Sequence, residues 1–451
     1  MEGEALEEFD PVAYINEPRW RKVSLGLDRT RLLLDLLGRP QDNLRFVHVA
    51  GTNGKGSTSK FMAAALQEAG YRTGLYTSPY IETFEDRIQV DGQNIPADDL
   101  LSATLDVREA AAKVEARLGE HPTEFELMTA VGMLHFARRG CDIVVLEVGM
   151  GGRLDSTNAI DAPEAAVITR LGLDHTAVLG DTIEAIAGEK AGIIKDGSPV
   201  VSWPQVPEAA AVIERAAAEH HTTVREPDFS QLSYGPVQGS AAGGATRPFS
   251  YRERSYQTRL LGSYQPANAA LAIEALDVLR GLGWEIPEEA VRRGIAQAAW
   301  PGRFEIVDGG GEGRPTILVD GGHNPQGARA LVDSLDDVFP GARPVFVVGF
   351  LADKDYRTMV RTLLPVGSAF VTVAPESPRA LSAQALAEEF RRAKAELPAG
   401  SEEAQTAAQA PVVAAESMPD AVARARELVG TDGLICGCGS LYDVAAFKNA
   451  L

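Results

Sequence analysis

Short apolar runs alternate with amphipathic segments through the first 300 residues of the chain. A short apolar run is typical of a strand buried on both faces, whereas apolar residues three and four positions apart indicate one face of a helix. Strands that alternate with helices predict a parallel α/β sheet. The predicted strands are residues 45–50, 73–76, 142–146 and 165–169, with a short edge strand at 87–90. The predicted helices are the opening segment to residue 40, then 58–69, 97–118, 123–138, 183–194 and 265–279.

The alternation restarts in the second half, after Trp300-Pro-Gly-Arg303 breaks the pattern. We therefore predict two domains, residues 1–298 and 299–451, both of the α/β class. Residues 230–247 are rich in Gly, Ser, Ala and Gln, which predicts an irregular surface excursion, and residues 396–411 predict an exposed connection. The later strands are predicted at 316–319, 345–348, 369–373 and 434–438. The later helices are predicted at 326–338, 357–364 and from 383 onward.

Net charge and composition exclude some classes of binding partner. The 451 residues carry 43 Lys and Arg against 63 Asp and Glu, a formal net charge of −20. Nucleic acids and anionic membranes both attract basic surfaces, so neither is an expected partner. The three cysteines do not form a disulfide framework. The acidic first ten residues lack the apolar core of a signal peptide, and no run is apolar and long enough to cross a bilayer. These features predict a cytoplasmic protein.

The segment His48-Val-Ala-Gly-Thr-Asn-Gly-Lys-Gly-Ser57 lies between a predicted strand and a predicted helix. In that context glycines let backbone N–H groups surround a phosphate chain, and the helix N-terminus favours negative charge. Lys55 can reach a β- or γ-phosphate oxygen, and Ser57 can contact phosphate or Mg²⁺. The loop is one residue shorter than the usual phosphate loop, and Gly56 separates the lysine from the serine. The motif alone fits a glycine-rich turn equally well, but the strand and helix around it favour a nucleotide site.

Three further residues follow strands of the predicted first sheet: Ser78, Glu147 and His175. Carboxyl ends of parallel strands share one edge, so these side chains can meet there. Mg²⁺ prefers oxygen ligands and commonly takes one or two carboxylates. Alternatively, His175 is a loop histidine bonded to Asp174 or a backbone carbonyl, and Glu147 caps the glycine turn beside it. Their joint placement favours a metal site.

The second half carries Asp320-Gly-Gly-His323-Asn-Pro325 and Asp353-Lys-Asp355, each after a predicted strand. Either segment also fits a solvated turn. Because both segments follow strands, they predict functional residues along the carboxyl edge of a second sheet.

The ordered motifs resemble the folylpolyglutamate synthase and dihydrofolate synthase family, which belongs to the Mur ligases. The resemblance runs from about residue 47 to the C-terminus and is specific as an ordered set. Its segments are His48–Ser57, Thr77-Ser-Pro79, Leu146–Asn158, Leu173-Asp-His175, Glu189-Lys-Ala-Gly-Ile193, Gly262–Asn268, Trp300–Arg303, Asp320–Pro325 and Gly439-Ser-Leu-Tyr442. Tyr80 and Gly322 depart from the family pattern, which often has histidine and alanine there.

The resemblance implies a P-loop ATPase domain, a smaller Rossmann-like C-terminal glutamate-ligase domain and an active site in the cleft between them. It implies ATP and two magnesium ions as cofactors, a possible monovalent cation, and Ser78, Glu147 and His175 as metal ligands. Lys190 matches a lysine that is carbamylated in the family; alternatively it is a surface lysine paired with Glu189. The implied catalytic residues are Lys55, Lys190 and His323. The implied ATP contacts are Gly51, Thr52, Asn53, Gly54, Lys55, Gly56, Ser57, Asn268, Arg303 and Asp320. Asp155 falls where bifunctional members hold the pterin, and His323 and Ser440 fall near the acyl-acceptor site.

The implied reaction is phosphoryl transfer from ATP to a substrate carboxylate, followed by attack of L-glutamate on the acyl phosphate. The segment around Asp155 favours the bifunctional type, which uses both dihydropteroate and folates. Alternatives are a synthase restricted to polyglutamylation, a cell-wall Mur ligase and a nucleotide-binding module without catalysis. About forty-five residues precede the phosphate strand, which leaves little room for the N-terminal domain of a cell-wall ligase. A monomer with small-molecule partners only is expected.

Overall fold

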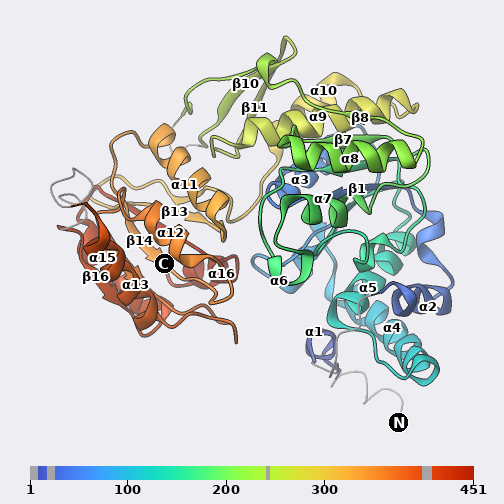
Figure 1. Cartoon of the computed structure of the whole chain (residues 1–451), viewed down its shortest axis with the longest axis horizontal. Helices are drawn as coiled ribbons and strands as arrows, with labels where there is room; N and C mark the ends of the chain where they lie inside the picture. Colours follow the sequence, from blue (N-terminus) through green and yellow to red (C-terminus); the bar gives the residue numbers. More distant parts are fainter. Residues whose placement is uncertain (1–8, 18–25, 240–243, 399–408) are drawn as a thin grey trace. The chain divides into compact units, whose positions relative to one another are not determined.

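The computed structural model describes residues 9–17, 26–239, 244–398 and 409–451. The chain forms two compact units. The first unit contains residues up to Phe229 and Asn268–Ile295, and the second contains Ser230–Ala267 and Ala296–Leu451 (Figure 1). The predicted connection at 396–411 lies largely outside the described residues.

The first unit is built on an eight-stranded sheet in the order β4-β3-β2-β5-β1-β6-β7-β8. Strands β2, β5, β1, β6, β7 and β8 are parallel, while β3 and β4 are antiparallel additions. The central strands β1 and β5 are buried throughout, as their mainly apolar sequences predict. The strands are β1 (Phe46–Ala50), β2 (Thr73–Tyr76), β3 (Ile88–Val90), β4 (Gln93–Asn94), β5 (Ile143–Glu147), β6 (Ala165–Ile168), β7 (Val200–Ser202) and β8 (Val224–Arg225).

The helices of the first unit bury apolar faces. One cluster of buried side chains includes Leu33, Val107 and Val131, where the N-terminal helices pack on one another (Figure 1). Another includes Ile168, Ala187 and Ile213, beneath α7 and α8. The helices are α1 (Pro11–Asn16), α2 (Asp28–Leu36), α3 (Lys55–Glu68), α4 (Ala97–Leu118), α5 (Glu124–Arg138), α6 (Thr176–Leu179), α7 (Ile183–Ala191), α8 (Pro207–Glu219), α9 (Gln265–Gly281) and α10 (Glu288–Gln297).

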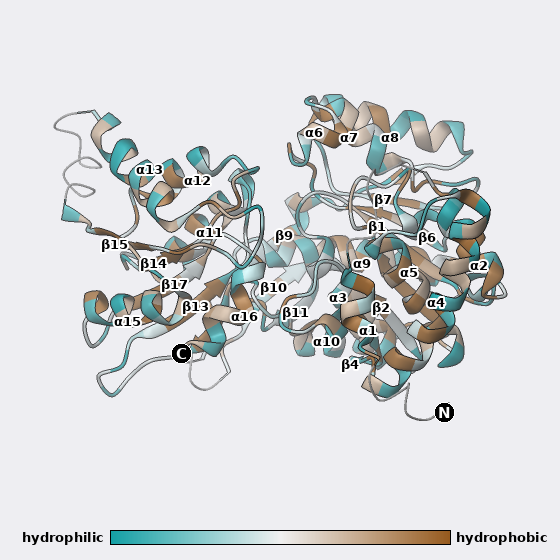
Figure 2. Ribbon diagram, turned by 90° about the horizontal axis from the view of Figure 1, so that it is seen from below, coloured by the Kyte–Doolittle hydropathy of each residue, from teal (hydrophilic) through white to brown (hydrophobic). Residues whose placement is uncertain are grey.

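The second unit is built on a six-stranded sheet in the order β12-β13-β17-β14-β15-β16, parallel except for the β12–β13 pair. In Figure 2 the brown, hydrophobic colour is concentrated on these strands, and residues of α13 are mainly teal. The strands are β12 (Glu305–Asp308), β13 (Thr316–Asp320), β14 (Val345–Val348), β15 (Ala369–Thr372), β16 (Val412–Ala414) and β17 (Leu434–Cys438). The helices are α11 (Pro325–Val338), α12 (Tyr356–Leu363), α13 (Ala383–Glu396), α15 (Met418–Val429) and α16 (Tyr442–Asn449).

Residues 230–267 differ from the prediction, which placed them in the first domain and made 230–247 an irregular excursion. They contribute the strands β9 (Leu232–Tyr234), β10 (Arg247–Tyr251) and β11 (Arg254–Thr258), which form an antiparallel sheet within the second unit. Arg247 anchors this sheet: its fully buried guanidinium donates to the Leu261 and Gly235 carbonyls and pairs with Asp337 of α11. The predicted edge strand at 87–90 exists as β3, but the two-residue β4 covers its outer side.

Candidate nucleotide and metal site

The phosphate loop joins β1 to α3 and divides into two halves. The first half is fixed to the segment after β6, because the amides of Thr52 and Asn53 donate to the Arg170 carbonyl at 3.2 and 3.1 Å. The second half starts the helix, since α3 begins at Lys55, three residues earlier than predicted. The first turn of a 14-residue helix therefore directs its backbone amides toward the loop, which favours an anion.

Two glycines of the loop are required by both conformation and space. Gly51 and Gly54 have φ angles of 152° and 90°. A Cβ on Gly51 would lie 1.8 Å from Thr169 Oγ1, and one on Gly54 would lie 2.6 Å from Asn268 Oδ1. The structure thus places buried Asn268, at the start of α9, directly against the phosphate loop, and its contact with ATP stays a prediction.

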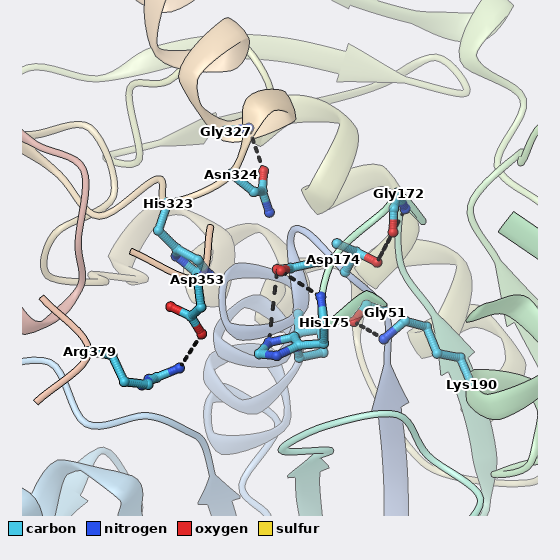
Figure 3. Close-up of polar contacts among 12 residues, drawn as sticks. Gly51, Gly172, Asp174, His175, Lys190, His323, Asn324, Gly327, Asp353 and Arg379 are labelled. Carbon is cyan, nitrogen blue, oxygen red and sulfur yellow. Dashed lines mark hydrogen bonds and ion pairs between the residues drawn. The ribbon is translucent and has the colours of Figure 1, made fainter. Parts of the chain in front are cut away.

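Lys190 is a buried residue of α7 rather than a surface lysine. Its Nζ donates to the Gly51 carbonyl at 2.8 Å, as Figure 3 shows. The alternative pairing with Glu189 does not occur, because Glu189 pairs with Arg153 at 2.6 Å. Burial, followed by the nearby charge of Lys55, lowers the pKa of Lys190 to about 7. A substantial fraction of this amine is therefore neutral near pH 7.

Ser78, Glu147 and His175 occupy different environments at the ends of β2, β5 and the segment after β6. Ser78 is half-buried, and Glu147 is 4% exposed with one carboxylate oxygen 3.9 Å from Lys55 Nζ. His175 is at the start of α6 with a φ of 51° and a 38% exposed side chain. Its contact with Asp174, proposed as the alternative, does occur: Asp174 accepts from the His175 amide at 2.8 Å (Figure 3). Within the described part of the chain, no three His, Cys, Asp or Glu side chains form a ready metal cluster.

Asp155 is buried within the glycine-rich loop that follows β5. Its carboxylate accepts from the Thr157 amide at 3.0 Å, the Thr157 hydroxyl at 2.5 Å and the Met150 amide at 2.9 Å. Thr157 also meets Nε2 of His48 on β1 at 2.9 Å, and burial lowers the pKa of that histidine to about 3, so it is neutral. The described contacts of Asp155 therefore order the loop; a contact with a pterin stays a prediction.

In the second unit, Asp320 ends β13 and is 3% exposed. It accepts from the amides of Gly322 and Phe304 at 2.8 and 2.9 Å and from the Tyr264 hydroxyl at 3.2 Å. Burial raises the pKa of Asp320, and the charge of Arg303 acts against that rise. Arg303 and Asp320, predicted from separate motifs, are thus brought together.

The remaining predicted positions lie at strand ends of the second unit. His323 is half-buried, and its Nδ1 contacts the Gly321 carbonyl at 3.1 Å. Ser440 follows β17, is 2% exposed and accepts from the Tyr442 amide at 3.2 Å. Asp353 pairs with Arg379 at 2.9 Å, and Asn324 caps α11 by accepting from the Gly327 amide (Figure 3).

Tyr264 and Arg170 received no role from the sequence, although both contact predicted site residues. Tyr264 lies inside the family motif Gly262–Asn268, and this position was the sequence feature that could have indicated a role. Arg170 contributes its backbone carbonyl, and because every residue has one, the sequence could not indicate this contact. All three cysteines are free and buried. None of the helices in the described ranges is long and apolar enough to span a bilayer.

Comparison with known families matches two domain models along the chain. Residues 49–276 match the Mur ligase middle domain, and residues 302–441 match the Mur ligase glutamate ligase domain. Both matches lie in the order that the motifs predicted.

Among known proteins, a dihydrofolate synthase/folylpolyglutamate synthase of Bacillus subtilis is 39% identical over 81% of this chain and 84% of its own length. A folylpolyglutamate synthase of Lacticaseibacillus casei is also 39% identical, over 82% of this chain and 86% of its length.

Solved structures agree with these relatives. A Mycobacterium tuberculosis folylpolyglutamate synthase complexed with ADP superposes with a TM-score of 0.84 at 30% identity, over 100% of this chain and 98% of that one. A folylpolyglutamate synthase complex with AMPPCP and folate superposes with a TM-score of 0.79 at 33% identity, over 97% and 98% of the two chains.

Proposed function

Because the chain belongs to the folylpolyglutamate synthase and dihydrofolate synthase family of Mur ligases, we propose that it joins L-glutamate to dihydropteroate and to the γ-carboxylate of folates. ATP is the energy source, and ADP and phosphate are products. The observation that carries the proposal is the phosphate loop, where the first turn of α3, Asn268 and Lys190 meet. The ADP and AMPPCP–folate complexes of the similar structures support the same ligand classes.

Two magnesium ions, the number that the family resemblance implies, are part of the proposal. The buried carboxylate of Glu147, the hydroxyl of Ser78 and the imidazole of His175 would hold metal, and Lys55 already balances Glu147 at 3.9 Å. When bound, magnesium supplies positive charge that stabilises the transferring phosphoryl group. Lys55 adds a fixed positive charge to the same end of the nucleotide.

Lys190 is proposed to carry a carbamate in the active enzyme. A neutral amine adds CO₂ and loses one proton, and a pKa of about 7 keeps much of Lys190 neutral at physiological pH. The product is anionic and keeps one N–H, so its carboxylate would turn toward positive charge. A monovalent cation, a monomeric state and a cytoplasmic location are further parts of the proposal that rest on the family resemblance and the composition.

The reaction proceeds in two balanced steps. A substrate carboxylate oxygen attacks the γ-phosphorus, the bond to the β-phosphate oxygen breaks, and ADP leaves. The amine of L-glutamate then attacks the acyl carbon, loses a proton, and expels phosphate that keeps the former carboxylate oxygen. The chain contributes by holding the phosphates at α3 and by placing Lys55 close to them. His323 and Ser440 are proposed near the incoming glutamate.

Phosphate release separates this function from its alternatives. The assay contains ATP, Mg²⁺ and L-glutamate, with dihydropteroate or a reduced folate as acceptor. Release with both acceptors supports a bifunctional enzyme, and release with the folate alone supports a polyglutamylating enzyme. ATP binding without glutamate-dependent release in either case would overturn the proposal and favour a non-catalytic module.

A further inference from the structure

Tyr264 is a polar side chain that touches a proposed ATP contact and has no assigned role. It is half-buried, and its hydroxyl lies 3.2 Å from Asp320 Oδ2. Desolvation, followed by the charge of Asp320, raises the pKa of Tyr264 well above its usual range. The phenol therefore keeps its proton and donates it to the carboxylate. A side-chain hydrogen bond with Gln265 acts against that rise in pKa.

Asp320 in turn fixes the backbone of two other motifs. One oxygen accepts from the Phe304 amide at 2.9 Å, next to Arg303, and the other accepts from the Gly322 amide at 2.8 Å. The Tyr264 hydroxyl shares the oxygen that holds Phe304. A single buried carboxylate thus connects the Tyr264 hydroxyl with the backbone of Phe304 and Gly322, all three within the second unit.

The groups that face Asp320 set its charge. Arg303 and the three hydrogen-bond donors favour the ionised form, whereas burial opposes it. The thiol of Cys436, on the neighbouring strand β17, is also near, and burial raises its pKa well above the usual value, so it is neutral. A buried carboxylate that loses one donor becomes harder to ionise.

The ring of Tyr264 is placed by Gly262. A Cβ at position 262 would lie 2.7 Å from Cε1 of the ring and 2.9 Å from Cζ. Only a residue without a side chain lets the ring lie where its hydroxyl reaches Asp320.

We propose that Tyr264 is a positioning residue of the nucleotide site, whose hydroxyl holds Asp320, and through it the Phe304 and Gly322 amides, in the arrangement that binds ATP. The inference rests on the proposed function, in which Arg303 and Asp320 contact ATP. Tyr264 is expected to affect nucleotide binding rather than the phosphoryl-transfer step, because its hydrogen bond to Asp320 is already present without ATP.

The first test is Tyr264→Phe, which removes one hydroxyl and keeps the ring. The Kd for ADP and the KM for ATP are expected to rise roughly three- to tenfold with little change in kcat, as for the loss of one hydrogen bond of ordinary strength. The acid limb of the pH dependence of ADP binding is expected to move to higher pH, because Asp320 then protonates more easily. Tyr234→Phe is the matched control, since it removes an exposed hydroxyl from the same unit and should change neither quantity.

A second variant, Gly262→Ala, keeps the hydroxyl and displaces the ring. It should weaken ADP binding in the wild type and add little in the Tyr264→Phe background, because both changes act through one contact. Unchanged ADP affinity and an unchanged pH profile in Tyr264→Phe, or fully additive effects in the double variant, would overturn the inference. A wild type that binds ADP but forms no glutamylated product would refute the proposed function and leave this inference intact.

Discussion

The ionisable side chains expected to affect function and stability most are those that are buried. Lys190 is 5% exposed, and its amine meets a backbone carbonyl of the phosphate loop. The family motif Glu189–Ile193 singled out Lys190, but its burial could not be told from residue type alone, because Lys195, beyond the end of the same helix, is also largely desolvated. The distinction arises from the groups each amine reaches.

Lys190→Ala is expected to reduce turnover at least about a hundredfold, because the proposed anionic carbamate beside the phosphate loop is lost. The fold should survive, since a lysine whose burial disfavours its charge is a poor source of stability. The measurement is kcat by phosphate release, with the melting temperature as a check. Lys195→Ala is the control: it removes a half-buried amine that donates to the Asn158 and Ile160 carbonyls and should cost stability more than turnover. Near-normal turnover of Lys190→Ala would contradict its role.

Asp443 supplies a pH test of stability. Burial, followed by the charge of Glu376, raises the pKa of Asp443 from 3.8 to about 7, and its Oδ2 has no hydrogen-bond partner among the described residues. Between about pH 4 and 7 the folded state keeps a proton that the unfolded state has lost. The free energy of unfolding therefore falls as pH rises through that window, because ionising Asp443 is unfavourable in the folded state. Above pH 7 this ionisation lowers the free energy of unfolding by its full amount, at most about 4 kcal/mol.

Asp443→Asn removes this titration, so it should gain stability relative to the wild type at pH 8 and much less at pH 5. Thermal unfolding of both proteins at the two pH values measures the difference. An equal effect at pH 5 and pH 8 would show that Asp443 is ionised in the folded protein.

At the scale of elements, the strand–loop–helix unit around Gly54 depends on one backbone conformation. Gly54→Ala must place a Cβ at a φ of 90° and 2.6 Å from Asn268 Oδ1, so it should displace Asn268 and abolish tight nucleotide binding. Gly70→Ala is the matched control, because Gly70 has a φ of 93° and nothing within 4 Å of the added carbon. Both variants should lose a similar, small amount of stability from backbone strain, of about 1 kcal/mol. ADP titration that shows equal affinity for the two variants would contradict the assignment of the loop.

Elements were predictable where their own residues determined them. The buried strands β1, β5 and β6 are all-apolar or nearly so, and the Thr123–Glu126 capping box marked the start of α5. The start of α3 was placed three residues late, because Lys55, Gly56 and Ser57 are polar or small and begin a helix only in the phosphate-loop conformation. Strand β9 was missed because it is short and largely exposed, so it has no buried alternation to detect.

At the scale of the whole molecule, the chain passes between its two units more than once. The predicted boundary after residue 298 lies close to one crossing, after Ile295, but residues 230–267 join the second unit earlier in the chain. Local pattern could not show this, because the attachment depends on tertiary contacts such as Arg247 with Asp337 and Ser263 with Ser334. The site followed the same rule: the motifs named candidate residues, Tyr264 and Thr157 lay within those motifs without a role, and their contacts and the contact of the Arg170 carbonyl became visible only in the fold.

The net charge of −20 does not conflict with anionic ligands, because the candidate site is locally positive. Lys55 and the backbone amides in the first turn of α3 supply positive charge around the phosphate loop of the first unit. Since bound ligands stabilise only the folded state, ADP at saturating concentration should raise the melting temperature.

The central claim is that the chain activates a carboxylate with ATP before glutamate attacks, and the most direct measurement follows one oxygen atom. A folate labelled with ¹⁸O in its γ-carboxylate is incubated with ATP, Mg²⁺ and L-glutamate, and the released phosphate is analysed by mass spectrometry. An acyl phosphate transfers one labelled oxygen to each phosphate formed, in proportion to glutamylated product. Unlabelled phosphate would mean that water attacks ATP, and it would contradict the account.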